Sequence, residues 1–226
     1  MIEAVIFDFD GLILDTETTL YEAWRQTYAR YGCALSLEQW GANVGGHSYE
    51  AFHPLEYLVE NANAAFDAKA VDRARYEQYK EWVWKQEAAP GAGALMAALR
   101  EAGLAVGVAS SSPRHWVQGH MERLGLWSLL EAGCFGDEVA AVKPDPGVYL
   151  KAIETLGVGP RAACALEDSP KGIAAAKAAG LYCIAVANPV TAILDLSGAD
   201  WRVTSLEALR VEHLLTIDQR EKRHAV

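Results

Sequence analysis

The chain has 226 residues, of which 51% are apolar, and it carries a formal net charge of −10. This length suffices for one large domain or two small ones with a sizeable core, and the apolar content excludes a disordered chain. The negative charge disfavours nucleic acid as a partner, because nucleic-acid binding requires a basic surface.

Composition also bears on location. The sequence has no apolar run of about 18 residues, so we expect no membrane-spanning segment and no membrane partner. No basic region precedes the first apolar run, which contains no signal-peptide pattern. The four cysteines lie far apart and form no Cys-x-x-Cys pair, which favours free thiols over disulfides or zinc. We therefore expect a cytoplasmic protein, and a monomer by default.

The first predicted element is a buried strand at residues 4–7, an apolar run that ends in two acids. Asp8 and Asp10 are separated by one Phe, so in an extended strand their side chains leave on the same side. Two like charges at the end of a buried strand raise at least one pKa, unless a divalent cation lies between them. Gly11 permits a sharp turn and a close approach to a ligand.

Residues 16–86 predict a helical insertion. Leu20, Trp24, Tyr28 and Tyr31 recur at helical spacing, and Thr16 is the expected N-cap of that helix. The region contains no strong strand pattern, and its residues 67–86 contain neither Gly nor Pro. We expect a discontinuous core domain of residues 1–15 plus 87–226, and a helical cap domain of residues 16–86.

From Pro90 onward, short apolar strands alternate with helical patterns. The expected strands are 104–109, 162–166 and 182–187, with shorter ones at 134–135 and 199–203. This alternation predicts an α/β fold with a Rossmann-like, doubly wound parallel sheet that is covered by helices on both faces.

Polar residues follow three of these strands. Asp8 and Asp10 end the first strand, Ser110 ends the second, and Glu167 and Asp168 follow the strand at 162–166. Right-handed crossovers place the carboxyl ends of parallel strands along one edge, where open α/β sheets bind ligands. The turn at 143–146 lies between two strands and can bring its lysine to the same edge.

The chemistry of this set suits phosphoryl transfer. Carboxylates such as Asp8, Asp10 and Asp168 are ligands that Mg²⁺ prefers. Lys143 and Ser110 can hold a phosphoryl group by charge and hydrogen bond, and an Asp can act as a nucleophile. Charge neutralisation, positioning and a proton donor are what this reaction needs.

The sequence resembles the haloacid dehalogenase-like phosphohydrolases over its whole length. Four motifs occur in the right order: Asp8-Phe-Asp10-Gly11, Val108-Ala-Ser110, Lys143-Pro-Asp-Pro, and Leu166-Glu167-Asp168-Ser169. The insertion after the first motif is similar to the small helical cap of the subgroup that includes β-phosphoglucomutase and phosphoglycolate phosphatase.

The resemblance implies a Mg²⁺-dependent phosphatase that acts on a small phosphorylated metabolite. Asp8 would be the nucleophile and Asp10 the general acid, then base. The metal ion would lie on Asp8, the main-chain carbonyl of Asp10, and Asp168, with Glu167 in the outer shell. Ser110 and Lys143 would bind the transferred phosphoryl group during catalysis. The residues expected to contact substrate are Gly11, Ser110, Ser111, Lys143, and the cap-loop residues Gly45, Gly46 and His47.

Two other interpretations remain open. A phosphomutase of the β-phosphoglucomutase type would use a His and an Arg from its cap, where this chain has Leu20 and Tyr49, and a cap-loop lysine, where it has Gly45. A receiver-like signalling module would also use a phosphorylated Asp, a Ser and a Lys on a parallel sheet. It needs only about half of this length and has no helical insertion.

Overall fold

A parallel β-sheet forms the base of the molecule. The computed structural model describes residues 1–41, 43–44 and 52–217. The strands lie in the order β3-β2-β1-β4-β5-β6, all parallel. Their bounds are β1 Ala4–Phe7, β2 Ala105–Ala109, β3 Ala132–Cys134, β4 Ala163–Glu167, β5 Tyr182–Val186 and β6 Trp201–Val203. Because β1 is central and the order reverses beside it, its carboxyl end opens into the crevice where doubly wound sheets bind ligands.

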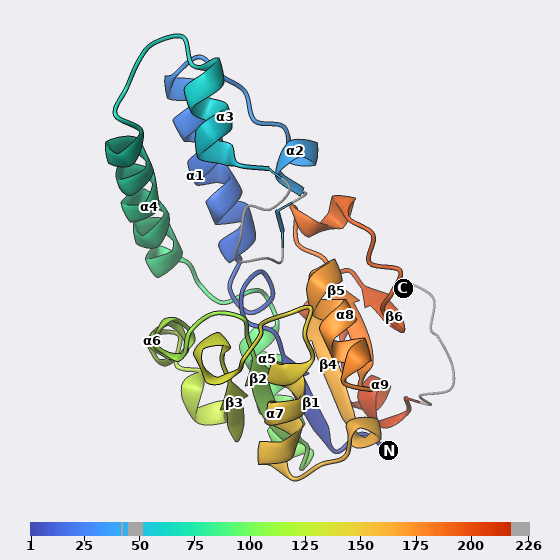
Figure 1. The fold of residues 1–226 in the computed structure, drawn as a ribbon. Helices are drawn as coiled ribbons and strands as arrows, with labels where there is room; N and C mark the ends of the chain where they lie inside the picture. Colours follow the sequence, from blue (N-terminus) through green and yellow to red (C-terminus); the bar gives the residue numbers. More distant parts are fainter. Residues whose placement is uncertain (42, 45–51, 218–226) are drawn as a thin grey trace.

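Helices cover both faces of the sheet (Figure 1). Those of the sheet region are α5 Ala92–Glu101, α6 Arg114–Arg123, α7 Gly147–Leu156, α8 Pro170–Ala178 and α9 Val211–Leu215. Helices α5, α6 and α9 pack into one apolar cluster, and α7 and α8 pack into the other. The predicted doubly wound α/β fold is therefore confirmed.

Strand β1 shows how the sequence divides between these clusters. Val5 and Phe7 belong to the cluster that contains α5, whereas Ala4 and Ile6 belong to the cluster that contains α7. This alternation follows from the two-residue period of a strand, and every residue of β1 is buried. A strand buried on both faces reads as a continuous apolar run, which is why residues 4–7 are recognisable from the sequence.

The chain between β1 and α5 forms a helical unit beside the sheet (Figure 1). Its helices are α1 Thr16–Arg30, α2 Leu37–Gly41, α3 Pro54–Asn61 and α4 Ala68–Lys85. They share an apolar cluster centred on the buried side chains of Trp24, Tyr28, Trp40 and Leu58, to which the sheet region adds Val190. That this unit is a separate cap domain stays a prediction.

The two connections to the helical unit lie against each other. The amide nitrogen of Ala89 donates a hydrogen bond to the carbonyl of Ile13, with 2.8 Å between N and O. The side-chain amide of Gln86 donates to the carbonyl of Asp15 at 3.3 Å. The chain therefore enters and leaves the helical unit at one place, next to the carboxyl end of β1.

Local details differ from the sequence-based expectations. The predicted N-cap of the first helix, Thr16, is wrong: Asp15 caps α1, and its Oδ1 accepts a hydrogen bond from the amide of Thr18 at 3.0 Å. A carboxylate at this position also complements the positive end of the helix dipole. The short strand expected at 134–135 instead covers Ala132–Cys134, because β3 pairs with β2 from Gly107 to Ala109.

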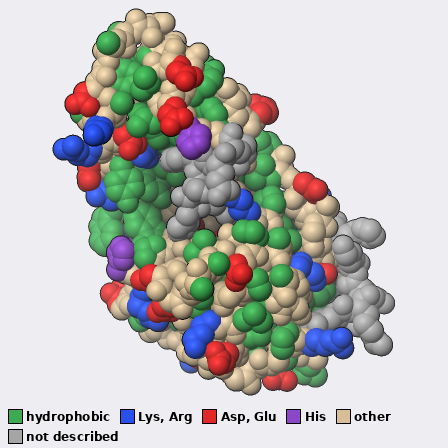
Figure 2. Space-filling model, in the orientation of Figure 1, with side chains coloured by type: hydrophobic (Ala, Val, Ile, Leu, Met, Phe, Trp, Pro, Cys, Tyr) green, Lys and Arg blue, Asp and Glu red, His purple; other side chains and the backbone are tan. Residues whose placement is uncertain are grey.

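The described part of the chain has no helix that is both long and apolar enough to cross a membrane. On the face shown in Figure 2, acidic and basic side chains are intermixed, and no basic patch stands out.

Candidate active site

A buried ion pair joins the first and third sequence motifs. Asp8 directly follows β1, and Lys143 lies in the turn that precedes α7. The ammonium nitrogen of Lys143 lies 2.6 Å from Oδ1 of Asp8, and both side chains are at most about a tenth exposed. Residues that are far apart in the sequence therefore meet at the carboxyl edge of the sheet, as the strand pattern predicted.

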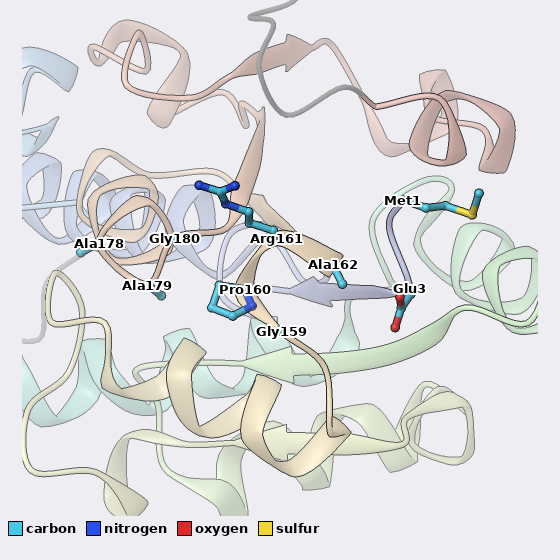
Figure 3. Close-up of a pocket in the computed structure, with 9 residues that line it drawn as sticks. All are labelled: Met1, Glu3, Gly159, Pro160, Arg161, Ala162, Ala178, Ala179 and Gly180. Carbon is cyan, nitrogen blue, oxygen red and sulfur yellow. The ribbon is translucent and has the colours of Figure 1, made fainter.

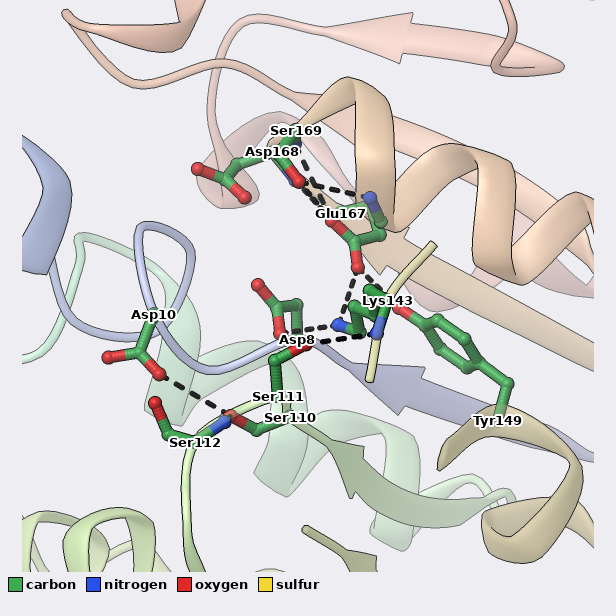
Figure 4. Close-up of polar contacts among 11 residues, drawn as sticks. Asp8, Asp10, Ser110, Ser111, Ser112, Lys143, Tyr149, Glu167, Asp168 and Ser169 are labelled. Carbon is green, nitrogen blue, oxygen red and sulfur yellow. Dashed lines mark hydrogen bonds and ion pairs between the residues drawn. The ribbon is translucent and has the colours of Figure 1, made fainter. Parts of the chain in front are cut away.

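Glu167, at the end of β4, is the second partner of this lysine. Its Oε1 lies 2.6 Å from Nζ of Lys143 and accepts a hydrogen bond from the hydroxyl of Tyr149 at 2.7 Å. Its Oε2 accepts from the amide of Asp168 at 3.1 Å. Figure 4 shows Lys143 between Asp8 and Glu167. Because its side chain is fully buried, Glu167 is not a surface acid.

Asp168 completes a group of three carboxylates. One oxygen from each of Asp8, Glu167 and Asp168 lies within 4.8 Å of the others. The side-chain amide of Asn188 holds Asp168 in place by donating to Oδ2 at 2.7 Å, and it also donates to the carbonyl of Gly11 at 3.1 Å. Gly11 has a positive φ of 84°, and a Cβ there would lie 2.2 Å from Oδ2 of Asp168. Only glycine fits this position.

The electrostatics of the group follow from its burial. Burial raises the pKa of Asp8 to about 7, with Lys143 opposing the shift and Glu167 adding to it. Burial, together with the charges of Asp8 and Glu167, also raises the pKa of Asp168 well above its usual range. Burial alone would lower the pKa of Lys143, but its two carboxylate partners raise it above the ordinary value. The lysine is therefore a cation at neutral pH.

Asp10 lies next to this group, with its carboxylate directed away from it (Figure 4). Its Oδ2 accepts a hydrogen bond from the hydroxyl of Ser110 at 3.3 Å, and its Oδ1 accepts one from the indole of Trp116 at 3.0 Å. The Ser110 hydroxyl in turn accepts from the amide of Ser112 at 2.9 Å. The side chain is half-buried, so it is open to solvent or to a ligand on one side.

Glu17, in the first turn of α1, adds another acid near the site. Burial raises the pKa of Glu17 to about 8, and the charges of Asp10 and Asp8 contribute to the shift. A carboxyl group in this state carries a proton at neutral pH and can donate a hydrogen bond. Its helix comes from the helical unit, so that unit contributes a polar group to the neighbourhood of the two aspartates.

The structure brings together most of the predicted site residues. Asp8, Lys143, Glu167 and Asp168 form one contiguous cluster, and Asp10 with Ser110 lies beside it. The hydroxyl of Ser111 accepts a hydrogen bond from the amide of Lys143 at 3.3 Å, so this serine supports the lysine turn. The predicted cap-loop residues Gly45, Gly46 and His47 lie outside the described residues. The catalytic, metal-binding and substrate-binding roles of all these residues stay predictions.

Sequence reasoning missed three side chains that contact the cluster or the neighbouring Asp10. Tyr149 lies in α7 among apolar residues, Asn188 follows a strand just before a proline, and Trp116 lies within α6. Each reaches the site through one polar atom, while the rest of the side chain packs elsewhere. The only sequence signal was the position of Asn188 after β5, at the same edge of the sheet as the other strand ends.

A pocket at the opposite end of the sheet lacks comparable chemistry. It lies beside the start of β1 and is lined by Glu3, Arg161 and mainly small residues (Figure 3). The buried carboxylate group is formed at the carboxyl ends of the strands instead. Chemistry that needs several converging polar groups is therefore favoured at that end.

Comparison with known protein families identifies one that matches most of the chain. Residues 5–186 match the family described as haloacid dehalogenase-like hydrolase. YhcW of Bacillus subtilis (strain 168), which is provisionally named a phosphatase, is 40% identical over 215 residues, covering 95% of this chain and 97% of YhcW. A phosphorylated carbohydrates phosphatase of Thermotoga maritima is 30% identical over 181 residues, covering 79% of this chain and 82% of that protein.

Solved structures agree with these relatives. A crystal structure from Thermotoga maritima, provisionally named a β-phosphoglucomutase, superposes with a TM-score of 0.76 and is 26% identical. The match covers 96% of this chain and all of the other, 100%. The similarity therefore includes the helical unit as well as the sheet.

Proposed function

The chain belongs to the haloacid dehalogenase-like hydrolases and is a phosphoric monoester hydrolase, and from this premise we propose that it cleaves a small phosphorylated metabolite through a phosphorylated Asp8. The observation that carries the proposal is the buried cluster of Asp8, Lys143, Glu167 and Asp168 at the carboxyl edge of the sheet. It supplies a nucleophile, a cation and ligands for a metal ion in one place.

The charge of the cluster fits a divalent cation. Three buried carboxylates face a single ammonium group, so the ionised cluster would carry two uncompensated negative charges. Buried charges without partners are costly, and the raised pKa values of Asp8 and Asp168 express that cost. Asp8 and Asp168 would hold Mg²⁺ together with the main-chain carbonyl of Asp10, and Glu167 would act from the outer shell. Bound there, Mg²⁺ would neutralise charge on the phosphoryl oxygens and keep Asp8 ionised.

In the first half of the reaction, a carboxylate oxygen of Asp8 attacks the phosphorus atom of the substrate. The bond from phosphorus to the leaving oxygen breaks, and Asp10 gives a proton to that oxygen. Lys143 neutralises charge on the transferring group from the side of Oδ1, and the Ser110 hydroxyl donates a hydrogen bond to a phosphoryl oxygen. The products are an alcohol and phosphorylated Asp8.

In the second half, water attacks the phosphorus atom of phosphorylated Asp8. Asp10 accepts the proton that the water loses, and the bond from phosphorus to the Asp8 oxygen breaks. Inorganic phosphate leaves, and both aspartates return to their starting protonation states. The same side chain serves as acid and then as base, so it must lie next to Asp8 and must not be paired with Lys143. Asp10 meets both requirements, because its hydrogen-bond partners are Ser110 and Trp116.

A phosphorylated carbohydrate is the substrate class that we favour. A relative that shares 30% identity is named a phosphorylated carbohydrates phosphatase. We also propose that residues 16–86 act as a cap domain over the core, with the loop that contains Gly45, Gly46 and His47 next to the substrate, and that the enzyme is a cytoplasmic monomer.

The phosphomutase alternative has one supporting observation, the structural similarity to a protein named β-phosphoglucomutase. A mutase must bind a second phosphate and protect its phosphoenzyme from water. It therefore releases phosphate slowly and depends on a bisphosphate activator. Continuous phosphate release at a constant rate without any bisphosphate would exclude this alternative.

Replacement of Asp8 tests the proposal. The variant Asp8→Asn should lower kcat for p-nitrophenyl phosphate with Mg²⁺ by roughly 10⁴-fold or more, because the nucleophile is lost. The matched control is Asp67→Asn, which changes the same group at the N-cap of α4, where asparagine caps equally well. Multiple turnover by the control and none by Asp8→Asn, with unchanged circular dichroism, is the expected result. Full activity in Asp8→Asn would remove Asp8 from the nucleophile role, and multiple turnover by the wild type excludes a signalling module.

A further inference from the structure

We propose that Trp116 is a positioning residue for Asp10, and that its ring is held for this purpose between helix α4 of the helical unit and helix α6 of the sheet region. The proposal rests on the proposed function, because it assumes that Asp10 transfers a proton to the leaving oxygen. It adds a residue that lies outside all four sequence motifs.

The two oxygens of Asp10 have different partners. The Trp116 indole donates to Oδ1 at 3.0 Å, and the Ser110 hydroxyl donates to Oδ2 at 3.3 Å. The indole bond is the shorter of the two and has ordinary N–H···O length, whereas the other is long for a bond between two oxygens. Trp116 therefore fixes the orientation of this carboxylate more firmly than Ser110 does.

The two donors also differ in what they do when substrate binds. A serine hydroxyl has a single proton to donate, and in the proposed reaction Ser110 donates it to a phosphoryl oxygen. Asp10 then loses that partner while it must still point at the leaving oxygen. An indole N–H donates only and carries no transferable proton at neutral pH, so Trp116 acts through Asp10 and keeps its orientation during the reaction.

Packing holds the indole in its position. On one side, Trp116 stacks on Tyr79 of α4, with ring centroids 6.1 Å apart and an interplanar angle of 17°. On the other side, it meets the edge of His120, one turn further along α6, at 4.4 Å and 71°. Tyr79 is only 8% exposed and His120 only 3%, so neither ring has room to turn away. Such aromatic pairs favour one relative geometry.

This arrangement connects the orientation of Asp10 to the helical unit. Tyr79 belongs to α4, which lies in the chain between the first and second motifs, whereas Trp116 belongs to α6, which follows the second motif. The indole can donate to Asp10 only while its ring stays between the two helices. The contact between α4 and α6 therefore helps to set the geometry of the acid.

The test compares two esters whose leaving groups differ in their need for a proton. Phenyl phosphate releases a basic phenolate and needs the acid, whereas 2,4-dinitrophenyl phosphate releases a weakly basic one and does not. The variant Trp116→Phe keeps an aromatic ring between α4 and α6 but removes the donor. We expect kcat/KM to fall by about tenfold or more for phenyl phosphate and by less than about twofold for 2,4-dinitrophenyl phosphate, with inhibition by inorganic phosphate unchanged.

Two variants make the comparison specific. Trp127→Phe removes the indole of a half-buried tryptophan that stacks on Phe135, and both esters should react at wild-type rates. Asp10→Asn should show the same dependence on leaving group as Trp116→Phe, only stronger. In the double variant, Trp116→Phe should add less than about twofold to the loss caused by Asp10→Asn, because the indole acts through that carboxylate.

Equal losses for the two esters in Trp116→Phe, or independent losses in the double variant, would overturn the proposal. Different results would contradict the proposed function itself. In that case the wild type would hydrolyse neither ester, or the loss of kcat/KM in Asp10→Asn would be the same for both leaving groups.

A second measurement covers the case in which Trp116→Phe does not fold. In the nuclear magnetic resonance spectrum of the protein, Asp10→Ala should move the indole proton signal of Trp116 upfield as its acceptor is lost, and leave that of Trp127 in place. An unmoved Trp116 signal would overturn the proposal.

Discussion

His120 illustrates how the behaviour of one side chain depends on neighbours from other elements. Its ring lies 4.4 Å from Trp116 and 5.3 Å from Trp84, the latter on α4, and its Nδ1 is buried with no hydrogen-bond partner in the described part of the chain. Burial lowers the pKa of His120, and the nearby Arg123 lowers it further, while Asp10 opposes the shift. The histidine is therefore neutral in the folded protein at neutral pH.

The pH dependence of stability follows from this shift. The pKa of His120 in the folded chain lies below its ordinary value of 6.5, so the unfolded chain binds a proton first as the pH falls. Below about pH 6.5 the wild type should lose stability until the folded state also binds that proton. His120→Phe keeps the ring contacts without a titrating group. We expect the free energy of unfolding, measured with urea, to fall less between pH 7 and pH 5 in the variant than in the wild type. Parallel pH profiles would contradict this assignment.

At the scale of single elements, the start of α8 supports the site. Ser169 caps the helix by accepting from the amide of Gly172 at 3.1 Å, and Pro170 begins it. The first turn lies directly over Glu167: a Cβ on Gly172 would come within 2.0 Å of Oε2 of that buried carboxylate. The glycine is therefore required by the closeness of helix and strand end, although glycine weakens a helix interior in general.

Alanine substitutions at two helical glycines separate these effects. Gly172→Ala should displace Glu167 from Lys143, destabilise the fold by roughly 2–4 kcal/mol and reduce phosphatase activity, because the buried ion pair is disturbed. Gly119→Ala is the matched control, since a Cβ there meets nothing within 4 Å. It should stabilise the protein by about 0.5–1 kcal/mol. Urea denaturation measures the change in the free energy of unfolding for each variant. Stabilisation by Gly172→Ala would contradict the prediction, because it would mean that the first turn of α8 moves to make room for the added Cβ.

At the scale of the whole molecule, the cores of the sheet and the helical unit are partly shared, because Ala23, Tyr79 and Val83 of the helical unit belong to one apolar cluster of the sheet. The apolar cluster of Trp24, Tyr28, Trp40 and Leu58 belongs to the helical unit, whereas the two clusters of the sheet lie on its faces. The carboxylate cluster and Lys143 come entirely from the sheet region. The helical unit contributes Glu17 and Tyr79 to the surroundings of Asp10. The two parts of the chain therefore supply different polar groups: the sheet region supplies the carboxylate cluster, and the helical unit supplies neighbours of Asp10.

Excision of the helical unit tests this separation. The two connections lie against each other, with 2.8 Å between the amide nitrogen of Ala89 and the carbonyl oxygen of Ile13, so a short Gly-Ser-Gly link can replace residues 17–85. We expect the shortened chain to unfold cooperatively at a lower temperature and to bind Mg²⁺ within about tenfold of the intact affinity, measured by calorimetry, because its carboxylates remain. Its kcat/KM should fall much further, by about 100-fold or more, because Asp10 loses its surroundings. Loss of Mg²⁺ binding in a folded variant would contradict the separation.

The sequence by itself determined the strands, their carboxyl ends, and hence the meeting of Asp8, Ser110, Lys143, Glu167 and Asp168. It could do so because strand periodicity and turn residues are local signals, and a parallel sheet brings all its carboxyl ends to one edge. The sequence did not determine the start of α1, which is capped by Asp15 and not by Thr16, because neighbouring polar residues compete for the same amides.

Only the tertiary structure decided which other side chains serve the site. Three side chains outside the motifs each donate one hydrogen bond to an acid of the site: Tyr149 to Glu167, Asn188 to Asp168, and Trp116 to Asp10. Their partners are set by how helices and loops pack, over separations that local patterns do not encode. The physical reason is that a hydrogen bond forms only within a few tenths of an ångström of its preferred donor–acceptor distance and within a narrow range of angles. Only the assembled core fixes these distances and angles.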